Sequence, residues 1–273
     1  MNECLEVALQ GESSLDCDLI ILYTGMGHNF KDLLNEAHNL APSAQVVGCT
    51  CAGIIGKEGP DESLRALAIM AIKGPKDEFA VSGVESMVNV DLRETFSKAA
   101  IDLKNRNPGI NMIFCHPNML MIERRFIDGI ESVFGPDIPI VGGISCDNMK
   151  LISSYQFMGE HVLEQGAILI GFADPTLELI SHANHGFDVI GKPFEVTKSA
   201  NNVVLEMDGR SPWKCWTERL GMPETSSMID VLTFAPLAEE LPAELQEEYG
   251  SPYLIVAGYL GANGSIYANR PIP

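Results

Sequence analysis

One succession of apolar segments occurs twice in this chain, and it restricts the fold more than any other feature. "DLIILYT" (residues 18–24) has the length and continuous apolar character of a buried strand. "AQVVGCT" (44–50) resembles it and follows after a segment with helical spacing. The same order returns in "INMIFCH" (110–116), a helical segment (126–134) and "IPIVGGISCD" (138–147).

The two copies keep a nearly constant spacing. Leu19 aligns with Met112 at an offset of 93 residues, and Gly48 aligns with Gly142 at an offset of 94. Two more strand-like runs complete each copy: "LRALAIMAI" and "EFAVSGVES" in the first, "GAILIGFA" and "LELISHANHG" in the second. We infer an internal duplication, with units at about residues 18–88 and 110–187. Two unrelated βαβ-like units would give a similar pattern by coincidence, and such units are common in α/β proteins.

The fold class that this duplication predicts is α/β. Each unit would form a sheet covered by helices on one face, and the bare faces of the two sheets would pack together. The result is a pseudo-symmetric α/β sandwich built from two related β-sheet/helix units. Residues 200–273 add a smaller C-terminal α+β portion, in which Trp213, Trp216 and Leu220 share one helical face. A hairpin near its end has its predicted turn at residues 262–264.

The formal net charge of −19 argues against several classes of partner. A negative field of this size repels nucleic-acid phosphates and anionic lipid headgroups. Hydrophobic residues make up 46% of the chain. No apolar run approaches the roughly 18 residues that a membrane-spanning helix needs. The seven cysteines lack the spacing of a disulfide framework, which indicates reduced thiols. We therefore expect a cytoplasmic protein with no nucleic-acid and no membrane partner.

The two glycine-ended strands predict one ligand site. Glycine permits positive φ and close backbone approach, so the N–H groups that follow are free to face a cavity. Strand ends are also where α/β folds usually bind ligands. The predicted ligand-binding residues are Gly48, Cys49, Thr50 and Gly53 in the first copy, and His116, Gly142, Gly143, Ser145 and Asp147 in the second. Asp147 is expected to hold an ammonium group, with Thr50 as the hydroxyl that corresponds to Ser145. The alternative is that the glycines serve only bulges or tight packing.

Catalytic and metal-binding interpretations start from cysteines in the same region. Cys49 and Cys51 form C-x-C, but the C-x-x-C or Cys/His spacing of structural zinc sites is missing. A cysteine enzyme would use Cys49 or Cys146 as its nucleophile, with His116 stabilising the thiolate. The motifs G-x-S-x-G, the P-loop and G-x-G-x-x-G do not occur. We expect no enzymatic activity, no metal and no cofactor.

Three stretches resemble the FIST domains, a pair of modules called FIST N and FIST C. They are "VVGCTCAGIIG" (46–56), "PIVGGISCDN" (139–148) and "GFDVIGKPFEVTKSANNVVLEMDGRSPWKCWTERLG" (186–221). Each motif alone is short, but their shared order over some 200 residues is specific. The resemblance implies a FIST N-like domain over residues 1–199 and a FIST C-like domain over residues 200–273. We expect the second domain to be truncated at its C-terminus.

The resemblance also implies a function. FIST domains occur in prokaryotic signalling proteins and in some eukaryotic F-box proteins, and are thought to sense small molecules in the cytoplasm. Amino acids or related metabolites are the implied ligands, and an output signalling domain or protein is the implied partner. Thr197 lies where the resemblance implies a link between the modules, and it joins the predicted ligand-binding residues. Two alternatives stay open: the cysteine-dependent enzyme, and a scaffold that only recruits a protein partner.

Overall fold

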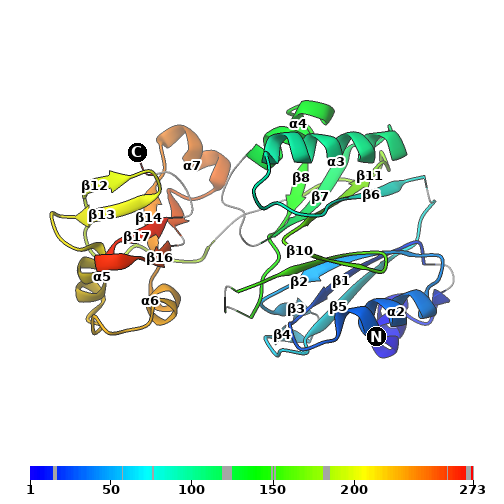
Figure 1. Cartoon of the computed structure of the whole chain (residues 1–273), viewed down its shortest axis with the longest axis horizontal. Coiled ribbons are helices and arrows are strands. Elements are labelled where there is room, and N and C mark those ends of the chain that lie inside the picture. The colour runs from blue at the N-terminus through cyan, green and yellow to red at the C-terminus, as the bar shows by residue number, and fades with distance from the viewer. Residues whose placement is uncertain are drawn as a thin grey trace. The chain divides into compact units, whose positions relative to one another are not determined.

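We describe a computed structural model of the chain. It covers residues 1–273 and describes all of them except 15–16, 57, 76, 119–124, 149, 151, 181–184, 257, 269–271 and 273. The chain divides into two compact units, Met1–Glu178 and Leu179–Pro273, and each is described by itself. The mixture of helices and sheets confirms the predicted α/β class (Figure 1). The division into family domains at residues 199 and 200 stays a prediction.

Two large, separate sheets form most of the first unit. One has the strand order β10-β9-β2-β1-β5, and its strands are β1 (Leu19–Thr24), β2 (Gln45–Thr50), β5 (Leu67–Ile72), β9 (Tyr155–Met158) and β10 (His161–Glu164). The other has the order β6-β11-β7-β8, and its strands are β6 (Phe79–Val84), β7 (Met112–Pro117), β8 (Ile140–Gly142) and β11 (Ala167–Phe172). In each sheet the first strand of the copy pairs in parallel with the second, and antiparallel with β5 or β11.

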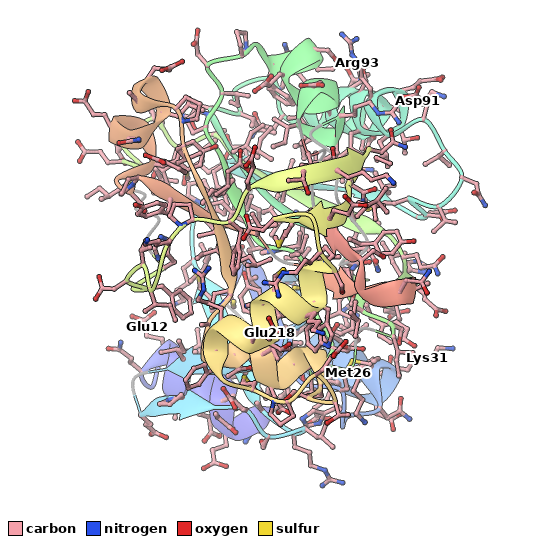
Figure 2. The ribbon with its side chains drawn as sticks, turned by 90° about the vertical axis from the view of Figure 1, so that its left-hand side faces the viewer. Glu12, Met26, Lys31, Asp91, Arg93 and Glu218 are labelled. Carbon is pink, nitrogen blue, oxygen red and sulfur yellow. The ribbon has the colours of Figure 1, made fainter. Side chains whose placement is uncertain are left out.

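Helices cover the outer face of each sheet. They are α1 (Asn2–Leu9) and α2 (Phe30–Leu40) on the first sheet, and α3 (Leu92–Arg106) and α4 (Arg125–Phe134) on the second. Both long helices begin at a side-chain cap: the Asp32 N–H donates to Asn29, and the Glu94 N–H donates to Asp91. Figure 2 shows Asp91 and Arg93 at the start of α3. Capping and amphipathic spacing therefore fix the positions of these helices.

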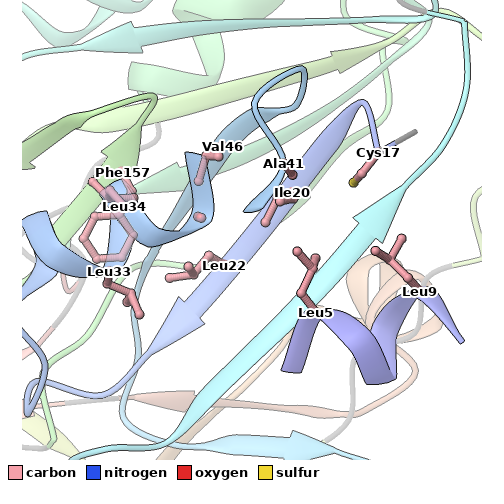
Figure 3. Packing of buried hydrophobic residues seen from close by; sticks show 11 residues of the cluster. Leu5, Leu9, Cys17, Ile20, Leu22, Leu33, Leu34, Ala41, Val46 and Phe157 are labelled. Atoms are coloured by element: carbon pink, nitrogen blue, oxygen red, sulfur yellow. The ribbon is translucent and has the colours of Figure 1, made fainter. Parts of the chain in front are cut away.

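The hydrophobic core follows the alternation of side chains along each strand. In β1, Ile20 and Leu22 pack toward α1 and α2, together with Leu5 of α1 (Figure 3). Leu19 and Ile21 point the other way, into a cluster that joins the two sheets. The unit is therefore a sandwich with helices outside and sheets inside.

The structure differs from the sequence-based expectations in two hairpins and in one expected strand. Predictions from periodicity did not include the hairpin β3 (Ile54–Gly56) with β4 (Gly59–Asp61), or the hairpin β9–β10. The strand expected over residues 177–186 is wrong for its described part, because residues 177–180 form no strand. Residues 181–184 lie outside the described chain. Leu179 and Ile180 are 39% and 90% exposed, so no sheet buries this apolar run.

The second unit contains a sheet of order β12-β13-β17-β16 and a two-stranded ladder β14-β15. Its elements are β12 (Val196–Ala200), β13 (Val203–Met207), α5 (Pro212–Leu220), α6 (Met228–Phe234), β14 (Leu237–Glu240), α7 (Ala243–Tyr249), β15 (Tyr253–Val256), β16 (Gly258–Leu260) and β17 (Ile266–Ala268). Trp213 and Trp216 are buried on the inner face of α5, as their spacing predicts. The turn at Ala262–Gly264 links β16 to β17, also as predicted.

Candidate functional site

The two glycine-ended strands have the same geometry in both sheets. Gly48 lies beside Leu22 in the parallel pair β1–β2, and Gly142 lies beside Cys115 in β7–β8. Both glycines have positive φ, at 152° and 144°. A Cβ atom on Gly48 would lie 1.8 Å from the Leu22 carbonyl oxygen, and one on Gly142 would lie 2.0 Å from that of Cys115. Only glycine fits at these positions, so both residues have a structural role whatever the site binds.

The chain turns after each glycine, and the two turns meet. The Cys51 N–H donates to the Thr24 carbonyl and the Ser145 N–H to the Pro117 carbonyl, each at 2.9 Å. The Cys146 N–H then donates to the Thr50 carbonyl at 2.9 Å, which joins one turn directly to the other. We call this region, made of residues 48–52 and 142–148 with Tyr23 and His116, the strand-end site.

The matching hydrogen bonds correct one sequence-based equivalence. Cys51 and Ser145 make the same backbone contact in the two halves, so the counterpart of Ser145 is Cys51. Thr50 precedes that position, and its hydroxyl accepts from the Tyr155 N–H at 3.0 Å. The expected correspondence of Thr50 with Ser145 is therefore wrong by one residue.

His116 connects the two halves at this site. Its Nε2 lies 3.0 Å from the Tyr23 hydroxyl, and its Nδ1 lies 3.2 Å from the Gly143 carbonyl oxygen. A carbonyl oxygen only accepts, so Nδ1 carries the proton and Nε2 of the neutral ring accepts from the Tyr23 O–H. Burial lowers the pKa of His116, against the opposing effect of the Gly143 hydrogen bond. Burial, with smaller contributions from Cys49 and Cys51, raises the pKa of Tyr23 to about 12.

Two predicted ligand groups are buried and bonded inside the protein. The Ser145 hydroxyl donates to the Pro117 carbonyl at 3.1 Å and also contacts Ser154 and Gln156. The Asp147 carboxylate accepts from the Ile152 N–H at 2.7 Å, which fixes the loop after β8. Ser145 is 0% exposed and Asp147 is 3% exposed. Both side chains therefore hold nearby backbone in place and are not exposed at the surface of the site.

Asn148 is a site residue that the sequence reasoning missed. Its Oδ1 accepts from the Met26 N–H at 3.2 Å, and its Nδ2 donates to the Ala52 carbonyl at 3.2 Å. This one side chain therefore ties the loops after β1, β2 and β8 together. Its sequence signals are its place directly after Asp147 and its position at the end of the stretch "PIVGGISCDN" (139–148).

The surface of the site is formed by backbone and by uncharged side chains. Gly142, Gly143 and Ile144 are exposed, while Cys51 and Cys146 are partly exposed. A Cβ atom on Gly143 would meet nothing within 4 Å, so open space adjoins this backbone. These groups, rather than the buried Thr50, Ser145 and Asp147, are the ones that a molecule from solution can contact.

The thiols at the site are poorly activated. Burial, followed by the influence of Cys51 and Cys146, raises the pKa of Cys49 well above that of a free thiol. Burial also raises the pKa of Cys51, and it raises the pKa of Cys146 together with the adjacent Asp147. Among the described residues, no group of three or more His, Cys, Asp or Glu side chains is arranged to hold a metal ion.

Two predicted residues stand apart from this arrangement. A Cβ atom on Gly53 would lie 3.1 Å from the Glu62 side chain and 3.2 Å from the Asp61 carbonyl, which indicates close packing against β4. Thr197 belongs to the second unit, where it is exposed and accepts from the Gly209 N–H at 3.0 Å. The site roles predicted for both residues stay predictions.

Comparisons with known proteins agree with the motifs. The family model of the FIST N domain matches residues 18–210. Two uncharacterized proteins from Mycobacterium tuberculosis strains, CDC 1551 and H37Rv, are each 26% identical over 186 residues, which is 66% of this chain. The chain spans about half the length of these relatives, 45% in each case.

A solved structure of cyanuric acid hydrolase from A. caulinodans is 9% identical to this chain. The match covers 63% of this chain and 62% of the hydrolase chain. Its TM-score of 0.32 is too low to support an argument about fold or function. Separately, the described helices include none with the length and apolar character needed to cross a membrane.

Proposed function

Because the chain belongs to the FIST family of signal-transduction sensors, we propose that the strand-end site is its sensing site. The ligand is a small neutral or zwitterionic molecule, such as an amino acid or a related metabolite. It binds without being chemically changed. The protein acts in the cytoplasm and passes the bound state to an output signalling domain or protein.

The observation that carries this proposal is the hydrogen bond between the two turns, from the Cys146 N–H to the Thr50 carbonyl. It brings backbone from both halves to one place, where a single molecule can contact both. His116 adds a second connection, because it bonds to Gly143 on one side and to Tyr23 on the other. A ligand that binds at Gly143 therefore lies next to His116, which hydrogen-bonds to residues of both halves.

The chemistry of the surface favours a small polar ligand. Exposed backbone at residues 142–144 offers N–H and C=O groups, and the thiols of Cys51 and Cys146 are weak hydrogen-bonding groups. The buried carboxylate of Asp147 lies close enough to influence Cys146 electrostatically. Its negative charge favours an ammonium group nearby, in keeping with the predicted role of Asp147.

The alternative of a cysteine enzyme is less well supported. A nucleophilic cysteine needs a lowered pKa or a general base that takes its proton. Here burial raises the pKa values of Cys49 and Cys146, and both ring nitrogens of His116 already have partners. A purely recruiting scaffold predicts no response to small molecules, so a ligand screen separates it from a sensor.

The test is a thermal-unfolding screen with the twenty common amino acids and a panel of small metabolites. A ligand that binds only the native state, supplied at about 100 times its Kd, adds about 2.7 kcal/mol of stability, or roughly 5–10 °C in Tm. Gly143→Val places a side chain in the open space at the site and should abolish the shift. Gly56→Val is the matched control, because a Cβ there also meets nothing within 4 Å. A shift that survives Gly143→Val would place the ligand elsewhere, and no shift in the whole panel would favour the scaffold.

A further inference from the structure

A groove with a volume of about 470 Å³ opens in the first unit, away from the strand-end site. It adjoins Gln45 and Val47 at the start of β2, whereas the strand-end site adjoins Thr50 at the end of that strand. Val47, Val81 and Met158 give it apolar walls. Its volume lies within the range of about 300–1,000 Å³ that is typical of ligand sites.

β6 runs along this groove as an edge strand. Its only partner in the described chain is β11, so its other edge is unpaired. The Ala173 N–H donates to the Glu78 carbonyl. In an antiparallel pair every second residue hydrogen-bonds to the partner strand, so residues 78, 80, 82 and 84 are the ones that bond to β11. By that alternation, the N–H and C=O groups of Val81 and Gly83 point away from β11. Both residues line the groove.

Ser82 supplies a second and independent sign of a ligand. It is 3% exposed, and within the described part of the chain its hydroxyl has no hydrogen-bond partner. A buried hydroxyl without a partner costs about 1–3 kcal/mol, so such groups are rare unless something else bonds to them. Ser82 also lines the groove, on the side of β6 that carries Ala80 and Val84 and faces α3.

We propose that this groove binds a short extended peptide, which adds to β6 as an antiparallel or parallel strand. Val81 and Gly83 each present a donor and an acceptor, about 6.6–6.8 Å apart along the strand. Another extended main chain matches this repeat, and strand addition is a known mode of peptide recognition. Alternate peptide side chains then face the apolar wall at Val47 and Met158.

The remaining side chains of the peptide face Ser82 and the end of α3. A Ser, Thr, Asn or Gln side chain at that position satisfies the Ser82 hydroxyl. Asp102 and Arg106 line this side and form an ion pair with each other at 2.9 Å, so the rim carries both signs of charge. The preferred peptide therefore alternates apolar residues with uncharged polar ones.

Gly83 offers a variant that blocks the groove with little risk to the fold. A Cβ atom there would meet the terminal atoms of Met158 at 3.0 Å, and this flexible side chain can move aside. Gly83→Leu should therefore fold and fill the groove. Gly56→Leu is the matched control, because its added side chain enters open space outside the groove.

The experiment selects octapeptides from a random displayed library against the full chain and measures their Kd by fluorescence polarisation. The selected peptide should bind Gly83→Leu at least about tenfold more weakly and bind Gly56→Leu unchanged. Ser82→Ala should weaken binding about threefold to tenfold, the size of one neutral hydrogen bond. The same peptide with alternate N-methyl amides keeps its side chains but cannot pair with β6, and should lose binding. Hydrogen exchange at the Val81 and Gly83 amides should slow when the unmodified peptide binds.

Three results would overturn the proposal. One is that no selected peptide is weakened by Gly83→Leu. Another is that N-methylation leaves affinity unchanged, which would mean that side chains alone are recognised. The third is that a free amino acid displaces the peptide competitively, which would make the groove a small-molecule site. None of these results bears on the strand-end site, because Gly143→Val tests that site separately.

Discussion

Tyr23 and His116 occupy equivalent positions in the two halves of the first unit, 93 residues apart, and bond directly to each other at 3.0 Å. Their rings meet edge to face, with centroids 5.4 Å apart and planes at 84°. Equivalent residues that touch lie on the axis relating the two halves. The pair therefore marks the centre of the pseudo-symmetric arrangement, next to the turns that form the strand-end site.

Removing the Tyr23 hydroxyl should destabilise the protein. Tyr23→Phe leaves the buried Nε2 of His116 without its donor, at a cost of about 1–3 kcal/mol in the free energy of unfolding. Tyr155→Phe is the control, because the Tyr155 hydroxyl has no partner among the described residues, and it should change stability by under about 0.5 kcal/mol. Urea denaturation measures both. Equal stability of the two variants would contradict the role given to this hydrogen bond.

Acid should destabilise the protein through His116. Burial lowers the folded-state pKa, while the unfolded chain titrates near about 6.5. Between these two values the unfolded state binds more protons, so stability rises with pH. The contribution is complete above about pH 6.5 and is lost as the pH falls through the folded-state pKa. Urea titrations from about pH 7.5 to 5 should show a smaller slope for His116→Gln than for the wild type.

Alanine should be tolerated very differently at three glycines of the strand-end site. Gly48→Ala and Gly142→Ala force a Cβ to within 2.0 Å of a neighbouring carbonyl oxygen, at positive φ. Each should cost more than about 4 kcal/mol or prevent folding. Gly143→Ala meets open space and should lie within about 0.5 kcal/mol of the wild type. Soluble yield and Tm report the difference. A mild effect at Gly48 would mean that the paired strands separate easily there.

Thiol alkylation tests the enzyme alternative. At neutral pH, Cys51 and Cys146 should react with iodoacetamide more slowly than free cysteine, since burial raises the pKa of each. Cys49 should be slower still, because it is 3% exposed. Mass spectrometry of the alkylated peptides gives the individual rates. A site cysteine that reacts faster than free thiol would restore the enzyme alternative.

Strands and helices of the first unit were largely predictable from local pattern. Continuous apolar runs correctly indicated β1, β2, β7 and β11, because these strands are buried on both faces. The special backbone positions at Gly48 and Gly142 could also be recognised from the sequence. Only glycine fits beside the neighbouring carbonyl oxygen, so the residue type itself marks the position. The local sequence pattern does not determine which strand each strand pairs with. Residues 177–180 have the apolar character of a strand, yet nothing pairs with them in the described chain.

The polar side chains of the site were predicted as a group but not by role. Ser145 and Asp147 follow the glycines, as a ligand-binding pair would, yet both are buried and bond to backbone groups. Whether a side chain after a turn points outward or inward depends on packing by distant segments, here the loop before β9. Asn148 was missed for the same reason, because its three partners come from elsewhere in the chain.

The two halves of the first unit exchange strands. β6 belongs to the first copy but pairs with β11 in the second sheet, and β9 belongs to the second copy but pairs with β2 in the first. Neither sheet is complete until both copies have been synthesised. A ribosome that has released only the first hundred residues has therefore produced a chain with exposed edges and no finished core. The duplicated halves must mature together, and a protein split between them would have to reassemble from two partners, neither of which is stable alone.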